Sequence, residues 1–107
     1  MVDVTLNIEV PGERGAIKLQ DATWEVNIWA PLVDLARLRD VRGARWEARG
    51  SLQIGQCAGA AVWWSEQDGQ VAVLVGHDDE TWDVAVWVPL STIDEIAALA
   101  ARELSIS

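Results

Sequence analysis

The sequence predicts an α+β domain, a mostly antiparallel sheet with two helices packed on one face. Three observations predict this class: residues 21–32 recur at 79–90, each copy is typical of a strand that runs into a helix, and turn residues separate the other β-rich runs. The chain has 107 residues, half of them hydrophobic, which suits one core. We expect a single domain, residues 1–107, made of two pseudo-repeats of about 1–43 and 44–107.

The repeated segment is the clearest internal pattern of the chain. Nine of its twelve aligned positions are identical or exchange close chemical types, as Glu25 exchanges with Asp83. Similarity of this length defines a structural unit. The sequence therefore predicts an internal duplication, with strands that lead into a helix in each half.

Within each copy, β-branched and aromatic residues alternate with others, which predicts a strand. Period two divides such a strand into two faces. Trp29 and Trp87 fall on the outer face, with acidic neighbours. The residues expected to face the core are Trp24, Val26, Ile28, Trp82, Val84 and Val86.

The other elements of the first half follow from alternation and turn residues. Residues 4–10 and 16–19 are expected strands, separated by a Pro-Gly turn. Proline suits the first turn of a helix, and Pro31 precedes an apolar stripe that predicts a helix over 32–39. Gly43 is a typical stop after such a helix.

The second half has a clear hairpin and a longer helix. Asp68 and Gly69 lie between two apolar runs and predict a two-residue turn. After Pro89, apolar residues at helical spacing predict a one-faced helix to about residue 104. The predicted order is β-β-β-α-β-β-β-β-α. The expected strands before the second repeat copy are residues 45–54, 61–64 and 71–75.

The charge of the chain restricts its partners. The formal net charge is −9 and the sequence pI is about 4.3, so the chain repels nucleic-acid phosphates and we expect no nucleic-acid partner. Residues 1–49 carry eight acidic and seven basic side chains, whereas residues 50–107 carry nine acidic side chains and only one basic one, Arg102. A basic partner would approach the second half first.

The chain has no feature of a membrane or exported protein. Its first ten residues lack a basic segment followed by an apolar run, and no apolar run approaches the roughly 18 residues of a membrane span. The single cysteine, Cys57, has no internal disulfide partner, which is typical of a reducing compartment. We expect a cytoplasmic protein with no membrane partner.

Residues 77–80, His-Asp-Asp-Glu, and nearby Asp83 form the densest group of titratable side chains. Such groups can bind metals, but consecutive residues converge poorly on one ion, and no second His or Cys lies at ligand spacing. The alternatives are a solvated turn and an electrostatic contact with a protein partner. The first copy has no equivalent of His77, Asp78 or Glu80, so the fold does not require them. We expect no metal and no cofactor.

Catalysis has weak support in the sequence. Cys57 and His77 are the only residues of their types, and a thiol–imidazole pair can act as a nucleophile. However, Cys57 lies among small residues, which is typical of a buried and inert thiol. Carboxylate pairs border many strands, and no spacing in the sequence indicates acid–base catalysis. We do not expect an enzyme.

Seven tryptophans in a chain without Phe or Tyr are the most unusual feature of the composition. Trp29, Trp87 and one of Trp63 and Trp64 are expected on the outer face, and we choose Trp64 as the contact residue of that pair. Exposed Trp is enriched at binding hot spots, while coverage by loops or chain ends is the alternative. The candidate partner-binding residues are Trp29, Trp64, Glu66, Asp68, His77, Asp78, Asp79, Glu80, Asp83 and Trp87.

Four segments carry a resemblance to a known family: residues 45–52, the hairpin run at 63–73, the strand at 83–89 and the closing helix. Their layout resembles that of the small immunity proteins encoded beside bacterial polymorphic toxins. The similarity covers residues 45–104 and consists of turn and strand patterns. It implies direct binding of a cognate toxin. Such proteins bind through divergent surfaces, so no functional residue is transferred.

The sequence therefore predicts a non-enzymatic acidic binding protein, most concretely an immunity protein that neutralises a basic toxin domain. Negative charge would speed the encounter, and buried Trp side chains would slow dissociation. The alternative is a self-associating or small-ligand-binding domain, in which the outer Trp face forms a homodimer or lines an apolar pocket.

Overall fold

The computed structural model describes residues 1–106, within which one seven-stranded sheet pairs each strand antiparallel with the next strand of the chain. The α+β class and the predicted order of strands and helices are confirmed. The strands are β1 (Asp3–Val10), β2 (Arg14–Gln20), β3 (Glu25–Pro31), β4 (Leu52–Cys57), β5 (Ala60–Gln67), β6 (Gln70–Gly76) and β7 (Trp82–Pro89). The helices are α1 (Leu32–Ala36) and α2 (Leu90–Ile106), with 3-10 segments η1 (Arg37–Gly43) and η2 (Trp46–Ala48).

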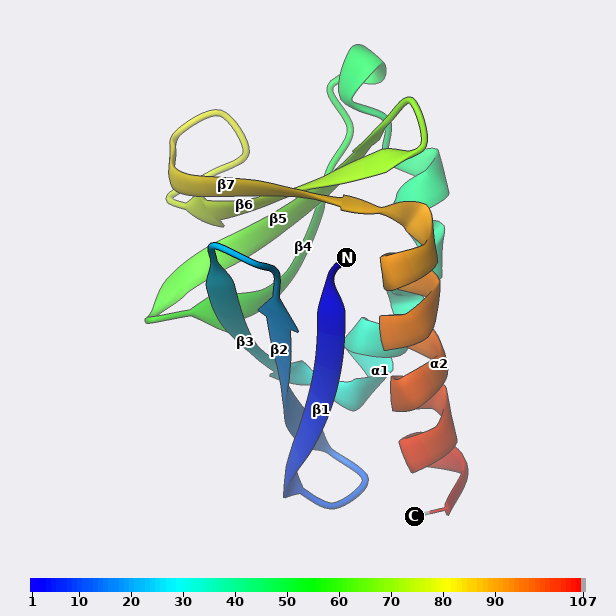
Figure 1. Cartoon of the computed structure of the whole chain (residues 1–107). Helices are drawn as coiled ribbons and strands as arrows, with labels where there is room; N and C mark the ends of the chain where they lie inside the picture. Colours follow the sequence, from blue (N-terminus) through cyan, green and yellow to red (C-terminus); the bar gives the residue numbers. More distant parts are fainter. Residues whose placement is uncertain (107) are drawn as a thin grey trace.

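The sheet bends between β3 and β4. In Figure 1, β1 to β3 stand in front of β4 to β7, and α1 and α2 lie together along one side. Only one register pair, Trp29 with Gln56, joins β3 to β4. Gly55 has φ +84°, and a Cβ there would lie 2.6 Å from Cγ2 of Ile28, so the position requires glycine. The bend creates a concave face that the helices fill.

The core lies between this concave face and the helices. Ile93, Ile96 and Ala100 are fully buried, as the predicted one-faced helix requires. Each fully buried Leu or Ile contributes about 1.5–3 kcal/mol. No helix of residues 1–106 is long and apolar enough to cross a membrane. Other large and fully buried side chains are Ile17, Leu19, Ile28, Leu32, Leu35, Leu38, Val41, Val62, Trp64 and Val71.

One ion pair joins the helical segments of the two halves. The Arg42 guanidinium of η1 donates to both carboxylate oxygens of Asp94 in α2, at 2.8 and 2.9 Å. This hydrogen bond lowers the pKa of Asp94 and raises that of Arg42. Because both side chains are about half exposed, water screens the pair and its contribution to stability is small.

Two predicted elements differ from the structure. The helix expected over 32–39 begins as predicted at Leu32, but it tightens to 3-10 geometry from Arg37 onward. The strand expected over 45–54 is wrong in its first part, because residues 46–48 form η2. Arg49 then takes a left-handed conformation with φ 57°, which turns the chain before β4 starts.

The two repeated segments form strands with equivalent pairing. Each pairs antiparallel with the strand before it, and Pro31 and Pro89 lie opposite the first residues of those strands, Arg14 and Gln70. In both segments the first helical residue donates its N–H to the turn that precedes the partner strand. These bonds are Leu32 to Glu13 (2.8 Å) and Leu90 to Gly69 (3.2 Å).

The expected core residues of the first copy are confirmed. Val26 and Ile28 are buried, and Trp24 packs partly buried against the core. In the second copy, Val86 packs partly buried against the same core. The other two expected core residues of the second copy, Trp82 and Val84, are exposed.

The expected core position of Trp82 is wrong. Trp82 pairs with Gly76, whereas Val84 pairs with Val75, so Asp83 is an extra residue in β7. Such a β-bulge changes which face the next side chain occupies, and Trp82 therefore lies on the outer face. Val84 was also expected in the core, but it is 47% exposed because β7 is the edge strand of the sheet.

Candidate functional site

Three tryptophans line a small, partly open cavity on the outer face of β6 and β7. Trp46 comes from η2, whereas Trp82 and Trp87 come from β7. Ala72 and Leu74 lie on this outer face, yet they are buried, because the tryptophans cover them. We call this volume of about 150 Å³ the tryptophan cavity. Its lining residues are Trp46, Ala72, Leu74, Trp82, Ala85 and Trp87.

Hydrogen bonds hold Trp46 over the sheet. The buried Ser65 hydroxyl lies 2.6 Å from the carbonyl oxygen of Gly50 and 3.3 Å from that of Ala44. The backbone N–H of Glu66 also donates to the carbonyl of Ala44, at 2.9 Å. These bonds fasten both ends of the segment that contains η2 to β5, so Trp46 is carried on a fixed turn.

Gly76 and the bulge at Asp83 position Trp82. A Cβ at Gly76 would collide with Cα of Trp82 and would lie 2.6 Å from the carbonyl oxygen of Thr81. Only glycine allows this close approach. The ring of Trp82 then meets that of Trp46 edge to face, with centroids 5.9 Å apart and planes at 76°. The two rings form perpendicular walls of the tryptophan cavity.

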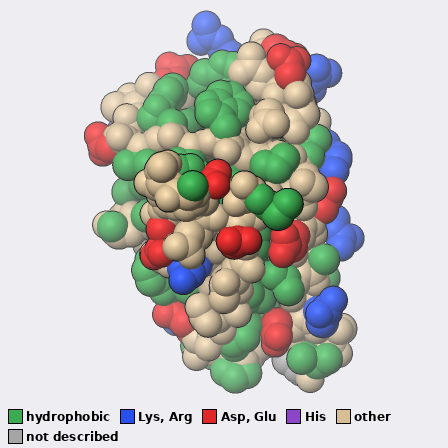
Figure 2. Space-filling model, viewed as in Figure 1, with side chains coloured by type: hydrophobic (Ala, Val, Ile, Leu, Met, Phe, Trp, Pro, Cys, Tyr) green, Lys and Arg blue, Asp and Glu red, His purple; other side chains and the backbone are tan. Residues whose placement is uncertain are grey.

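Trp87 completes the cavity from the outward position of β7 that follows Ala85. It lies opposite Ala72, whose small side chain leaves room for the indole. Trp87 is 51% exposed. Figure 2 shows hydrophobic side chains gathered between the tip of the β6–β7 loop and η2, with acidic side chains close by.

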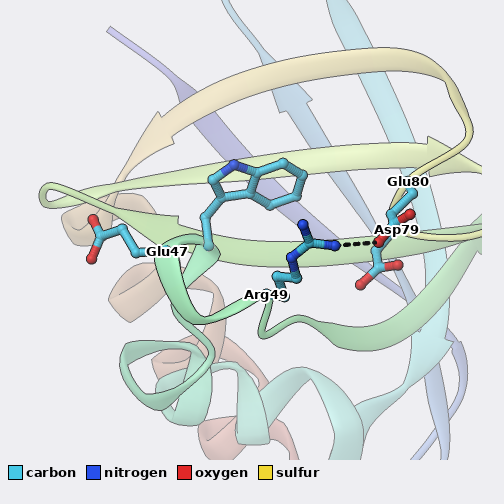
Figure 3. A pocket seen from close by; sticks show the side chains of 5 residues that line it. Glu47, Arg49, Asp79 and Glu80 are labelled. Atoms are coloured by element: carbon cyan, nitrogen blue, oxygen red, sulfur yellow. Dashed lines mark ion pairs between the residues drawn. The ribbon is translucent and has the colours of Figure 1, made fainter.

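An acidic pocket of about 480 Å³ adjoins the tryptophan cavity and shares Trp46 with it. Arg49 lies 3.6 Å from Glu80 as an exposed ion pair, and the two side chains point toward each other in Figure 3. The Ser51 hydroxyl donates to Asp79 at 2.8 Å. The acidic pocket is lined by Trp46, Glu47, Arg49, Asp79 and Glu80.

The loop that connects β6 to β7 is ordered by Asp78. One carboxylate oxygen of Asp78 accepts the backbone N–H groups of Glu80 and Thr81, at 2.8 and 2.7 Å. These bonds lower the pKa of Asp78, and the bond from Glu80 has the largest effect. The N–H of His77 donates to the carbonyl of Thr81 at 3.0 Å. Asp78 thus shapes the loop that presents the next two acidic residues.

The titratable side chains of this loop do not converge on one point. In residues 1–106, no three His, Cys, Asp or Glu side chains are placed to hold a metal ion. Asp79 and Glu80 line the acidic pocket, while His77 is exposed beyond it. Asp83, the bulge residue, is exposed next to Trp82. The loop therefore offers separate negative charges instead of a ligand set.

Two of the expected contact residues lie inside the protein. Trp64 is fully buried and donates its indole N–H to the carbonyl of Ile54 at 2.9 Å, so Trp63 occupies the outer position that we expected of Trp64. Glu66 is only 9% exposed, and its Oε2 has no hydrogen-bond partner among the described residues. Neither side chain is available to a partner. The alternation of β5 was therefore assigned to the wrong phase.

Trp29 and Asp68 lie apart from the tryptophan cavity. Trp29 is 42% exposed on β3, with three strands between β3 and β7 in the sheet order, and lines another pocket of about 300 Å³ with Cys57 and Val84. Asp68 lies at the exposed tip of the β5–β6 hairpin, where it and Gly69 have positive φ, as the predicted two-residue turn requires. The outer tryptophans thus divide into two places.

Sequence reasoning missed Trp46 and Trp82 as site residues. The available signal for Trp82 was Gly76 itself, a glycine that directly follows the predicted strand at 71–75. Glycine in a strand often marks a bulge or a close approach.

Comparison of the chain with protein-family models, curated proteins and solved structures finds no match.

Proposed function

We propose that this chain is a non-enzymatic binding domain that holds a basic protein partner against the tryptophan cavity and the acidic pocket. The observation that carries the proposal is the cluster of Trp46, Trp82 and Trp87 beside acidic side chains. Tryptophan is the residue most enriched at binding hot spots. An apolar centre with a charged rim is the usual anatomy of an interface.

The distribution of charge supports a basic partner. Nine of the acidic residues and only one basic residue belong to residues 50–107, which form all of β4 to β7 and α2. A partner of opposite charge is steered to such a surface and associates faster at low salt. A second acidic molecule is repelled, which argues against a homodimer through this surface.

The most concrete form of this proposal is an immunity protein that neutralises a cognate bacterial toxin in the cytoplasm. The resemblance in layout over residues 45–104 suggests this class, and the single cysteine suits a reducing compartment. Neutralisation by contact needs affinity and no chemistry. The acidic pocket would then guide a basic toxin surface, and the tryptophan cavity would retain it.

We also infer that residues 21–32 and 79–90 derive from one duplicated unit, and that the second copy carries the binding role. The similar pairing of Pro31 and Pro89 with the first residues of β2 and β6 supports this. In the second copy the bulge at Asp83 presents Trp82 outward, whereas Trp24 of the first copy packs against the core.

The test is co-expression with a toxic gene product encoded beside this chain. We expect the wild-type chain to restore growth and to co-purify with the toxin, and Trp82→Ala with Trp87→Ala to lose both effects. Trp29→Ala is the matched control, because it removes a similarly exposed Trp outside the tryptophan cavity. If the double variant still protects cells, the tryptophan cavity is not the contact. If no neighbouring product is toxic or binds, the immunity role fails.

A small apolar ligand is the second candidate, and one observation favours it. The 300 Å³ pocket that contains Trp29 lies between β3 and β7 and is lined mostly by apolar side chains, including Val26, Val75 and Val84. Its volume suits a small ligand. Quenching of Trp fluorescence by short-chain alcohols or fatty acids, lost in Trp29→Ala and kept in Trp87→Ala, would support this role. Equal quenching in both variants would reject it.

A further inference from the structure

The tryptophan cavity has the size of one side-chain end. Its volume of about 150 Å³ is below the range of roughly 300–1,000 Å³ that holds drug-sized ligands. Three indoles and three aliphatic side chains line it, and none of the six is charged. Whatever enters the cavity therefore meets aromatic faces and edges first.

The arrangement of the rings suits a cation. Trp46 and Trp82 stand at 76° to each other, so they offer their surfaces to one small volume from two directions, and Trp87 adds a third side. The face of an indole carries negative potential and attracts an ammonium or guanidinium group within about 6 Å. Aromatic enclosures of this kind recognise alkylammonium groups.

The charges around the cavity favour the same choice. Asp83 adjoins Trp82 in the bulge and Asp79 lines the adjacent pocket, whereas Glu47 is already paired with Arg45 at 2.9 Å. The nearest arginine of the acidic pocket, Arg49, is already paired with Glu80. An anionic ligand would be repelled, and a neutral one would gain nothing from these carboxylates.

We propose that the tryptophan cavity is an aromatic cage for one organic cation, which the partner presents as the end of a lysine or arginine side chain. The inference deepens the proposed function and rests on it for the identity of the natural occupant. The cage itself is testable without any partner, because a free alkylammonium ion carries the same chemistry.

The experiment uses choline as the probe and 3,3-dimethylbutan-1-ol as its uncharged isostere. Binding is followed through the indole N–H resonances of the seven tryptophans in the intact chain. We expect choline to shift the resonances of Trp46, Trp82 and Trp87 and to bind roughly 2- to 5-fold more tightly than the isostere. High salt should reduce the difference.

Two variants separate charge recognition from simple burial. Trp82→Leu keeps an apolar wall without a π face, and we expect it to lose the preference for choline over the isostere. Trp29→Ala is the control and should keep that preference, since Trp29 lies outside the cage. The unchanged resonance of the buried Trp64 would report an intact fold in both variants.

The outcomes are decisive and independent of the toxin test. Equal affinity for choline and the isostere, or no shift with either, would overturn the cage. A chain that binds choline in the cage but has no basic protein partner would keep this inference and remove the proposed function. If a partner is lost by Trp82→Ala with Trp87→Ala but is bound by Trp82→Leu as tightly as by the wild type, the function stands and the cage is removed.

Discussion

β3 and β7 have similar sequences and each pairs antiparallel with the strand before it, but they occupy different environments. β3 lies inside the sheet between β2 and β4, whereas β7 lies at the edge. Val26 is 7% exposed, and its counterpart Val84 is 47% exposed. The burial of a strand residue thus depends on what lies beside the strand, and similar strand propensity serves both environments.

The first residues of the two segments differ most. Trp24 packs against the core, while Trp82 forms a wall of the tryptophan cavity. One extra residue, Asp83, and one glycine, Gly76, separate the two results. A shift of one residue moves a side chain to the other face of a sheet. The difference teaches that a contact surface can be obtained from a core segment by a local change of register.

The largest expected effect comes from the interior of β3. Ile28→Ala should lower the free energy of unfolding by about 2–5 kcal/mol, because Ile28 is fully buried and the change leaves a cavity. The counterpart Val86→Ala should cost less than about 1.5 kcal/mol, since Val86 is only partly buried. Urea denaturation measures both values. Equal losses would contradict the difference between interior and edge strands.

Gly76 tests the origin of the difference. Gly76→Ala should lower the free energy of unfolding by about 1–3 kcal/mol, because the new Cβ would collide with Trp82. It should also remove the edge-to-face contact of Trp82 with Trp46, which near-ultraviolet circular dichroism would detect.

Gln20→Ala, at the last residue of β2 as Gly76 is the last residue of β6, serves as the control for Gly76→Ala. Gln20 is exposed and pairs regularly with Glu25, so its replacement should alter stability by less than about 0.5 kcal/mol. A stable Gly76→Ala variant with an unchanged aromatic spectrum would show that the bulge does not depend on glycine.

The two tryptophans should separate stability from binding. Trp24→Ala should lower the free energy of unfolding by about 2 kcal/mol, because Trp24 packs partly buried against the core. Trp82→Ala should cost about 1 kcal/mol through loss of the ring contact with Trp46. Only Trp82→Ala should weaken partner binding, by about 2 kcal/mol or more in a calorimetric titration. A loss of binding in Trp24→Ala alone would reverse the assignment of the two copies.

The smallest effect concerns the β6–β7 loop, which Asp78 orders through its side-chain hydrogen bonds. The pKa of Asp78 is lowered by bonds from the backbone N–H groups of Glu80 and Thr81. Because the folded loop lowers the pKa of this carboxyl, the ionised carboxylate stabilises the loop at pH values above its ordinary pKa of about 4. This stabilisation is lost as the pH falls through the lowered pKa of the folded loop. The protection factor of the Thr81 amide, the factor by which its exchange is slower than in an unstructured chain at the same pH, should therefore stay high at pH 5 and fall only below about pH 4. In Asp78→Ala, we expect a low protection factor at both pH values.

Much of the fold followed from the sequence. The hairpin at Asp68 and Gly69 and the one-faced helix after Pro89 each have a local cause, and each was confirmed. The class and the order of elements depend on such local signals, so they were predicted correctly. The functional prediction remains a proposal.

The errors share another cause, because they concern relations between strands. Alternation alone does not say which of Trp63 and Trp64 faces inward, and it does not show that Asp83 is an added residue. It also does not identify the edge strand, so Val84 was expected in the core. Trp46 was missed because the segment that contains η2 is held in place by the Ser65 hydroxyl, which bonds the distant residue Gly50. Register and tertiary contacts decide these positions.

The order of strands in space, which equals their order in the chain, has a consequence for how the protein folds. Each strand can pair with one that has just left the ribosome, so the sheet can grow by successive local hairpins. The core nevertheless stays open until α2, synthesised after all seven strands, brings Ile93 and Ile96 onto the concave face. A nascent chain stalled before α2 would expose that face, and it would be the form that chaperones bind and that aggregates.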